Sequence, residues 1–289
     1  MKITQIRSAT LIIETRDFHI LVDPMLARQS ALPKLRYFKS NQRNPLVELP
    51  ETFHDLKQQV NYALITHCQK GHFDHLDRAG VHWLRKHSIT TFCTTHDAGY
   101  LQKKGIPAQA LKDRVSTFFT GTIEQIPARH TTGWLTPFME HGVGYFIQLE
   151  NEPSLYLMGD TILTDVIREF VSTQQPDYIV APTGKAQFDV GAPLLLNEEE
   201  IIELASLSTG KIIANHMDAL DHCRITRKDL AQLLVEHSLT DRFIIPEDGE
   251  TIALDLRQSP ASTRAPGGSS SGETARQSVV SNRNQGVLP

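Results

Sequence analysis

Short apolar segments that end just before a histidine or an aspartate constrain this chain more than any other feature of its sequence. Residues 62–66 precede His67, residues 155–158 precede Gly159 and Asp160, and residues 211–215 precede His216. Runs of this length and composition are typical of β-strands. Side chains that follow separate strands can meet at one edge of a sheet. The sequence therefore predicts one site that is assembled from distant segments.

The remaining pattern predicts both strands and helices. Early strands are expected at 2–8, 10–14 and 19–22, and later ones at 144–150, 154–158, 177–181, 211–215, 243–245 and 251–254, with helices at 77–86 and 97–104. Asn197 with Glu200, and Thr226 with Asp229, resemble capping boxes that begin two further helices. Strand-rich halves followed by helices predict an α/β fold, an αββα sandwich of two mixed β-sheets with helices on the outer faces.

The composition changes after residue 257. Residues 258–289 are rich in Ser, Gly, Pro, Arg and Asn and contain no aromatic residue. Such a mixture buries too little apolar surface to offset its ordering entropy. We expect one domain at 1–257 and a disordered tail at 258–289. The alternative is that the tail is an appended or frame-shifted end.

Charge and cysteine content exclude several classes of protein. The 29 Lys and Arg against 33 Asp and Glu give a net charge of -4, which, without an RNA-binding motif, disfavours nucleic-acid processing. No apolar run reaches the roughly 20 residues that cross a bilayer, and no secretory signal is recognisable. Cys68, Cys93 and Cys223 are widely spaced and odd in number, which favours a reducing compartment. We expect a cytoplasmic protein with no nucleic-acid or membrane partner. The sequence is compatible with a homo-oligomer.

Three coordinating side chains fall within the five residues Gly-His-Phe-Asp-His at 71–75, which packing alone does not explain. Imidazole and carboxylate are the ligands that Zn²⁺ and related divalent ions accept. The candidate set, which is large enough for two ions sharing a water, is His67, His72, Asp74, His75, His130, Asp160 and His216.

Single members of this set also have simpler interpretations that involve no metal. His130 or His216 alone is more often a hydrogen-bonded histidine than a ligand, and Gly-Asp at 159–160 alone is more often a turn. Six other histidines have no candidate ligand close to them in the sequence and are expected to be surface or packing residues. They are His19, His54, His82, His87, His96 and His237.

In order and approximate spacing, these motifs resemble the signature of the metallo-β-lactamase fold. The resemblance covers residues 1 to about 256, and the opening strand, Leu-Val-Asp-Pro at 21–24 and the segment 245–250 resemble the stand-alone hydrolase branch that includes ascorbate-6-phosphate lactonase. It implies hydrolysis of an ester, lactone or phosphoester of a small polar substrate by a metal-bound hydroxide. The implied cofactor is a divalent metal, two Zn with Mn or Fe as alternatives.

The resemblance also implies a role for each candidate. His67, His72 and His130 would bind a first ion; Asp74, His75 and His216 would bind a second; and Asp160 would bridge the two. Asp74 would also orient the attacking water, so Asp74 and Asp160 are the implied catalytic residues. Asp23 resembles a buried aspartate that supports the ligands from behind.

One departure concerns the first ligand. The family pattern is His-x-His-x-Asp-His, whereas four residues separate His67 from His72 here. Either a small bulged loop around Gly71 returns His67 to the ion, or the gapless position falls on Lys70, whose ammonium would repel a cation. Cys68 is a further candidate, as a soft substitute ligand.

Substrate contacts are predicted from position alone. His222 follows His216 closely and is a candidate ligand or substrate contact, with a loop hydrogen bond as the alternative. Lys185, Gln187, Trp134 and Phe138 are candidates for the pocket mouth. The segment 27–50 carries five cations before its first acid at Glu48, so it is expected to act as a lid for an anionic substrate, or to be a solvated loop; the cations are Arg28, Lys34, Arg36, Lys39 and Arg43.

Three functional hypotheses follow. The first is a metal-dependent hydrolase that acts on a small molecule. The second keeps the fold but is metal-poor or holds one metal, and acts as a binding module. The third is an iron-loaded oxidoreductase, because the same ligands accept iron.

Overall fold

Two mixed β-sheets form the centre of the computed structural model, which describes residues 1–69, 71–131 and 142–256. The chain divides into two units, Met1–Arg257 and Gln258–Pro289, and all described residues belong to the first. The tail expected at 258–289, together with Lys70, Trp134 and Phe138, lies outside the described residues.

The first sheet has seven strands among the described residues, in the order β14-β1-β2-β3-β4-β5-β6. The strands are β1 (Lys2–Arg7), β2 (Thr10–Glu14), β3 (His19–Val22), β4 (Tyr62–Leu64), β5 (Thr90–Thr94), β6 (Ala108–Leu111) and β14 (Thr251–Ala253). Strands β14, β1, β2 and β3 pair antiparallel. From β3 to β6 the pairing is parallel.

The second sheet also has seven strands in the described part of the chain, in the order β13-β12-β11-β10-β9-β8-β7. They are β7 (Val115–Phe118), β8 (Gly121–Pro127), β9 (Val143–Gln148), β10 (Leu155–Leu157), β11 (Tyr178–Pro182), β12 (Lys211–Asn215) and β13 (Phe243–Ile244). Strands β7 to β10 pair antiparallel, and β10 to β13 pair parallel.

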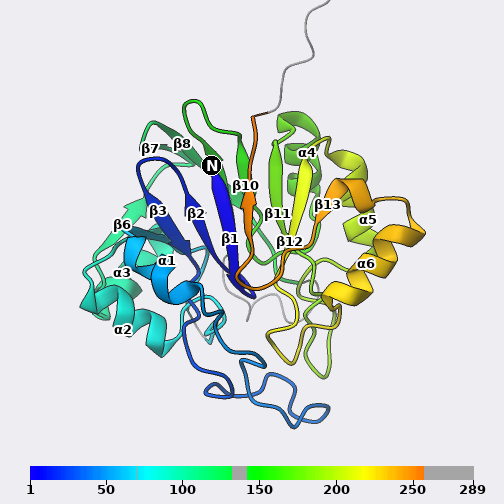
Figure 1. Cartoon of the computed structure of the whole chain (residues 1–289), viewed down its shortest axis with the longest axis horizontal. Coiled ribbons are helices and arrows are strands. Elements are labelled where there is room, and N and C mark those ends of the chain that lie inside the picture. Colours follow the sequence, from blue (N-terminus) through cyan, green and yellow to red (C-terminus); the bar gives the residue numbers. More distant parts are fainter. Residues whose placement is uncertain (70, 132–141, 257–289) are drawn as a thin grey trace, which may run out of the picture. The chain divides into compact units, whose positions relative to one another are not determined.

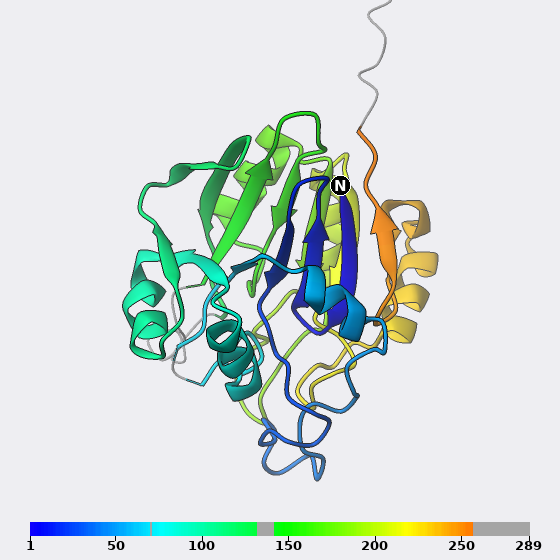
Figure 2. The same cartoon turned by 60° about the vertical axis from the view of Figure 1, so that its left-hand side comes forward.

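Helices cover the outer faces of both sheets (Figure 1). Near the first sheet lie α1 (Phe53–Gln59), α2 (Arg78–Lys86) and α3 (Thr95–Lys103); near the second lie α4 (Asp165–Gln174), α5 (Glu198–Leu207) and α6 (Arg227–Glu236). A short 3-10 turn, η2 (Thr240–Arg242), precedes β13. Figure 2, turned by 60°, shows the same layers from the side. The predicted αββα sandwich is confirmed.

Alternate residues of the strands enter different apolar layers. Leu11 and Ile13 of β2 pack between the two sheets, whereas Ile12 packs towards α1. In the same way, Ile213 of β12 faces the first sheet, and Ile212 faces the helices on the other side. Because side chains alternate across a strand, strands that are covered on both faces need apolar residues at nearly every position. This requirement explains the apolar runs in the sequence.

Side-chain caps mark where the helices begin. Both predicted capping boxes are present, Asn197 with Glu200 at α5 and Thr226 with Asp229 at α6. Helix α3 begins at Thr95, two residues before the predicted start, because the hydroxyl of Thr94 accepts the amide hydrogen of Asp97. The sequence analysis missed α1, α4 and the strands β5, β6 and β7. The strands among these are short and carry polar residues, so no apolar run marks them.

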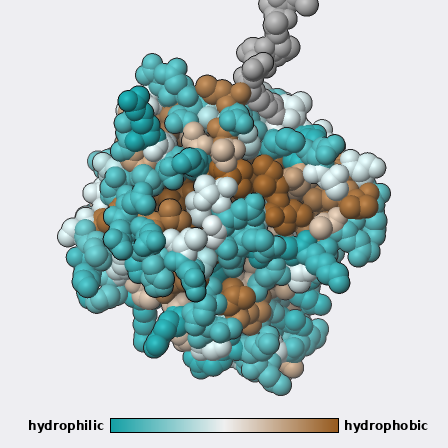
Figure 3. Space-filling model, in the orientation of Figure 1, coloured by the Kyte–Doolittle hydropathy of each residue, from teal (hydrophilic) through white to brown (hydrophobic). Residues whose placement is uncertain are grey.

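The face seen in Figure 3 is mostly hydrophilic, with hydrophobic residues in separate patches near its middle. In the described ranges no helix combines the length and the hydrophobicity that a membrane crossing needs.

A long connection without helices or strands joins β3 to α1 and lies at the lower end of Figure 1. The fully buried guanidinium of Arg7 anchors its two ends. Arg7 donates hydrogen bonds from Nη2 to the carbonyl oxygens of Met25 and Ala27, at 2.7 and 2.8 Å, and from Nη1 to that of Val47 at 3.0 Å. This side chain therefore ties the connection to the first strand.

We predict that Arg7→Met lowers the free energy of unfolding by about 3 kcal/mol, because three carbonyl oxygens lose charged donors and methionine supplies none. Urea unfolding followed by circular dichroism measures this change. The control is Arg85→Met on the exposed face of α2, which is expected to change the value by less than about 0.5 kcal/mol. Equal effects of the two substitutions would contradict the role given to Arg7.

Candidate metal centre

Strands that run in the same direction within each sheet bring the predicted ligands to one edge of the sandwich with their carboxyl ends. Each ligand lies in a segment that leaves a strand at this edge: His67, His72, Asp74 and His75 follow β4, His130 follows β8, Asp160 follows β10, and His216 follows β12. Their donor atoms form two groups, and within each group all the atoms lie within 4.8 Å of one another. The structure thus brings all seven candidates together.

His67, His72 and His130 form the first group. Nε2 of His67 lies 3.1 Å from Nδ1 of His72 and 3.0 Å from Nε2 of His130. His67 and His130 are buried. Three ring nitrogens at these separations can share one ion, because histidine binds zinc at about 2.0–2.1 Å.

His67 belongs to the first group although four residues separate it from His72. Gly71 has a φ of +100°, and the amide of His72 donates to the carbonyl of Gln69 at 3.3 Å. The turn at Gly71 is what the bulged-loop alternative predicts, whereas the other alternative concerns Lys70, which lies outside the described residues. Cys68 is not in either group, because its thiol donates to Oδ1 of Asp97 at 3.4 Å.

Asp74, His75, Asp160 and His216 form the second group, and all four are buried. Oδ2 of Asp160 lies 3.0 Å from Nε2 of His75 and 3.4 Å from Nε2 of His216. Oδ2 of Asp74 lies 3.7 Å from Nε2 of His216. Neither of these Nε2 atoms has a hydrogen-bond partner among the described residues. Buried polar atoms without partners are costly, so this arrangement fits a cation that both nitrogens and both carboxylates bind.

The two groups differ in their protonation. Burial, reinforced by the neighbouring imidazoles, lowers the pKa of His67 well below its usual value, and burial lowers the pKa of His130 to about 4. Burial also disfavours charge on His75 and His216, but nearby carboxylates, Asp160 foremost, outweigh it and raise the pKa of both imidazoles well above the usual value. His67 and His130 are therefore neutral and ready to bind an ion, whereas His75 and His216 hold protons that an ion would replace.

Asp23 lies behind the second group, as the family resemblance predicts. Its Oδ2 accepts a hydrogen bond from the Thr66 hydroxyl at 2.6 Å and lies 2.9 Å from Nδ1 of His75. Its Oδ1 accepts the amide hydrogen of Thr66 at 2.8 Å. These bonds orient the His75 ring so that Nε2 points to Asp160.

Left-handed backbone positions aim two other ligands. Gly159, just before Asp160, has a φ of +64°, and a Cβ atom there would lie 2.7 Å from the carbonyl oxygen of Val143. His216 itself has a φ of 58°, and its amide donates to the carbonyl of Ser8, in the turn between β1 and β2, at 3.1 Å. A non-glycine residue seldom adopts this conformation, so the contact with this turn holds His216 in place.

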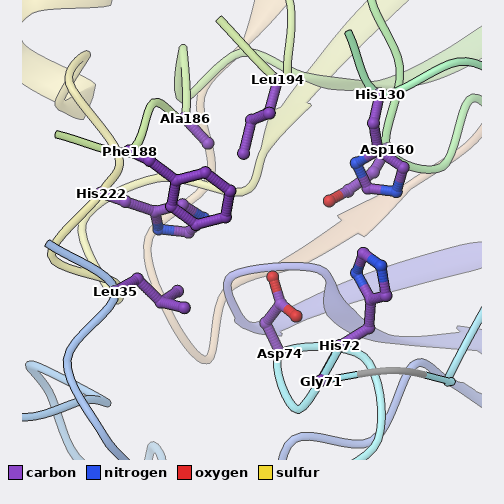
Figure 4. Close-up of a pocket in the computed structure, with 10 residues that line it drawn as sticks. All are labelled: Leu35, Gly71, His72, Asp74, His130, Asp160, Ala186, Phe188, Leu194 and His222. Carbon is purple, nitrogen blue, oxygen red and sulfur yellow. The ribbon is translucent and has the colours of Figure 1, made fainter. Parts of the chain in front are cut away.

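A pocket opens beside the two groups, with about 500 Å³ of empty space that is partly continuous with solvent. His72, Asp74, His130 and Asp160 lie on one side of it, and an apolar wall with one histidine lies on the other (Figure 4). That wall consists of Leu35, Ala186, Phe188, Leu194 and His222. The His222 ring stacks on Phe188 with 6.1 Å between centroids, and its buried Nδ1 has no hydrogen-bond partner in the described ranges.

The structure places several predicted pocket residues elsewhere. The Lys185 ammonium lies 2.6 Å from Oε2 of Glu198 on α5, and Gln187 donates to the carbonyl of Gly191 at 2.7 Å; neither lines the pocket. In the segment 27–50, Lys34 and Arg43 donate to backbone carbonyls of the segment itself. Among the described residues, no lysine or arginine lines the pocket.

Leu35, Phe188 and Leu194 line the pocket, but the sequence analysis missed them. They are single apolar residues in loops, and no periodicity distinguishes them from other loop residues. His222 was found because it lies close to His216 in the sequence.

Comparisons with known proteins agree with this architecture. A protein named UPF0173 protein YddR from Bacillus subtilis strain 168 is 29% identical over 255 residues, which cover 87% of this chain and 99% of the relative. The crystal structure of an isothiocyanate hydrolase from Delia radicum gut bacteria superposes with a TM-score of 0.79 and 30% identity, over 88% of this chain and 99% of that one. The structure of a "possible metal-dependent hydrolase" from Veillonella parvula DSM 2008 gives a TM-score of 0.79 and 27% identity, over 87% and 98%.

The family model of the beta-lactamase superfamily domain matches residues 19–233, which include all seven candidate ligands. The predicted resemblance to a stand-alone member of this fold is thereby confirmed. By sequence and by fold, this chain belongs to the beta-lactamase superfamily.

Proposed function

We propose that this protein is a metal-dependent hydrolase that holds two divalent ions, zinc in the simplest case, and cleaves a small uncharged substrate. One observation carries the proposal: two adjacent groups of imidazoles and carboxylates, all of them buried except His72, converge beside a pocket that His72, Asp74, His130 and Asp160 line. His67, His72 and His130 would hold one ion, and Asp74, His75 and His216 the other. Asp160 is the candidate bridge, since it lines the pocket and contacts the second group.

When bound, such ions lower the pKa of water and polarise the substrate. The chain's own residues supply the remaining functions. The Asp74 carboxylate borders the pocket; burial opposes its charge, but His75 and His216 hold its pKa below the usual range. It is therefore an acceptor that orients an attacking water by a hydrogen bond.

His222 is the candidate donor on the opposite wall. Its ring lines the pocket, and its Nδ1 is buried without a partner in the described structure. A departing nitrogen or oxygen atom of the substrate needs a hydrogen-bond donor as the bond breaks. In this proposal His222 supplies that hydrogen bond, and the apolar residues beside it exclude water.

The pocket lining bears on the substrate. An apolar wall without a described lysine or arginine favours an uncharged carbon electrophile over an anionic phosphoester. An ester and a lactone fit this description, as does an isothiocyanate, the substrate named for one structural relative. A panel of these three substrate classes and a phosphoester, assayed with zinc-, manganese- and iron-loaded protein, tests the proposal. The metal content also tests the alternatives, because a metal-poor or one-metal binding module would retain at most one ion per chain, and an oxidoreductase would hold iron and require it.

We predict that Asp160→Ala and His216→Ala each lower kcat/KM by more than about 100-fold and remove at least one ion, because each deletes a ligand. His67→Ala is expected to remove an ion of the first group. Metal analysis and steady-state kinetics are the measurements, with His82→Ala on the exposed side of α2 as the histidine control. Full activity and full metal content in both Asp160→Ala and His216→Ala would refute the ligand assignment.

We predict that zinc binding to the metal-free protein at pH 7 releases about two protons, one each from His75 and His216. Their raised pKa values keep both imidazoles protonated above pH 6.5, so the apparent affinity should fall as pH decreases from 8 to 6. Calorimetry in two buffers of different ionisation enthalpy measures the release. No proton release, with affinity independent of pH, would contradict this assignment.

We predict that His222→Phe lowers kcat by about 100-fold while two ions remain bound, because a hydrogen-bond donor to the substrate is lost but no metal ligand is. Metal content separates this result from the effect of His216→Ala. A variant with unchanged kcat, or one that loses an ion, would show that His222 does not have this role.

A further inference from the structure

The residue next to His222 in the sequence binds the backbone of the segment that carries Leu35. Asp221 is buried. Its Oδ1 accepts the amide hydrogen of Leu35 at 3.0 Å, and its Oδ2 accepts that of Arg36 at 3.1 Å. A carboxylate that accepts backbone amide hydrogens forms strong, charge-assisted hydrogen bonds.

Asn44 completes this attachment from the other end of the same segment. It is fully buried, and its Nδ2 donates to Oδ1 of Asp221 at 2.9 Å and to the carbonyl of Pro33 at 3.0 Å. Its Oδ1 accepts the amide hydrogen of Asp221 at 2.9 Å. The bridge between Leu32 and Asn44 closes the base of the loop. We call Asp221 and Asn44 the clamp.

The clamp sets the distance between two parts of the pocket wall. Leu35 comes from the connection between β3 and α1, more than 180 residues from Asp221, yet it lines the pocket on the same side as His222 and Phe188 (Figure 4). A second bond acts beside it, because Oδ2 of Asp189 accepts the amide hydrogen of Phe38 at 2.9 Å. Leu35 is thus held by its backbone, independently of the groups that bind the metal.

The charge of Asp221 suits this task. Its four contacts come from the amides of Leu35 and Arg36 and the side chain of Asn44, and all three groups are donors. In Asp221→Asn, one acceptor oxygen becomes an NH₂ donor that faces another donor. The substitution keeps the side-chain size but breaks part of the clamp.

We propose that Asp221 is a positioning residue that holds Leu35 as the size-limiting wall of the pocket. The substrate class that follows is a small electrophile whose uncharged apolar group lies against Leu35, Phe188 and Leu194. This inference rests on the proposed hydrolase function, which it deepens.

Two substrates that differ only in the apolar group provide the test: methyl isothiocyanate and 2-phenylethyl isothiocyanate. With zinc-loaded protein, Leu35→Ala is expected to raise the ratio of kcat/KM for the larger over the smaller substrate by about 10-fold, the range that small volume changes in apolar pockets produce. Asp221→Asn should shift the ratio in the same direction with two ions retained. The control Glu48→Gln changes a carboxylate that accepts the amide hydrogen of Gln29 in the same segment, and it should leave the ratio unchanged.

Two further measurements do not depend on turnover. Hydrogen exchange should be at least about 10-fold faster at the amides of Leu35 and Arg36 in Asp221→Asn, and unchanged there in Glu48→Gln. Calorimetric binding of N-methylthiourea and N-(2-phenylethyl)thiourea, which carry the same two groups, should show the same change in size preference for Leu35→Ala.

The outcomes separate the inference from the function on which it rests. If the wild-type protein hydrolyses neither isothiocyanate but the thioureas show the size shift, the reaction assigned to these substrates is wrong. The role of Leu35 as the size-limiting wall is then still supported. If exchange accelerates in Asp221→Asn while the size preference stays unchanged, the clamp exists but does not set the size limit, which overturns the inference. Should Asp221→Asn fail to fold, an unchanged preference in Leu35→Ala overturns it equally.

Discussion

The burial of many ionisable groups around one point is the constraint on which the rest of this structure depends. Seven imidazoles and carboxylates from four loops meet at the edge of the two sheets, and the Nε2 atoms of His75 and His216 lie there without hydrogen-bond partners in the described structure. Such groups are costly to bury unless opposite charge compensates them. The contact of Asp23 with His75 and the hydrogen bond from His216 to Ser8 hold these groups in place. A divalent cation would stabilise the arrangement.

The fold supplies the geometry, and the loops supply the chemistry. Parallel strands in both sheets end at the same edge, so the ligands need only follow those strands to converge. The opposite side of the pocket has a different origin, since Leu35 arrives on a long connection that Arg7 ties down at its ends and Asp221 and Asn44 hold near the pocket. One side of the pocket therefore suits ions and the other an apolar group, the combination on which the proposed function rests.

Much of this site was predictable because its residues carry a strong local signal. Three coordinating side chains at 71–75 and the ligands that follow the apolar segments 62–66, 155–158 and 211–215 locate the edge, whereas Asp23 comes from the family resemblance alone. The sequence leaves the position of His67 open, since the path of an inserted loop depends on tertiary contacts. It also misplaces Lys185, which pairs with Glu198, and gives no sign of Leu35 or Phe188, because apolar loop residues acquire their role only when distant segments pack together.

The most direct test of this account is the anomalous diffraction of zinc-soaked crystals, recorded on both sides of the zinc absorption edge. We expect two peaks, one in contact with His67, His72 and His130 and the other with Asp74, His75 and His216, with Asp160 touching both. Zinc-soaked crystals that show no peak at these residues, or that bind zinc only elsewhere on the surface, would contradict the central claim.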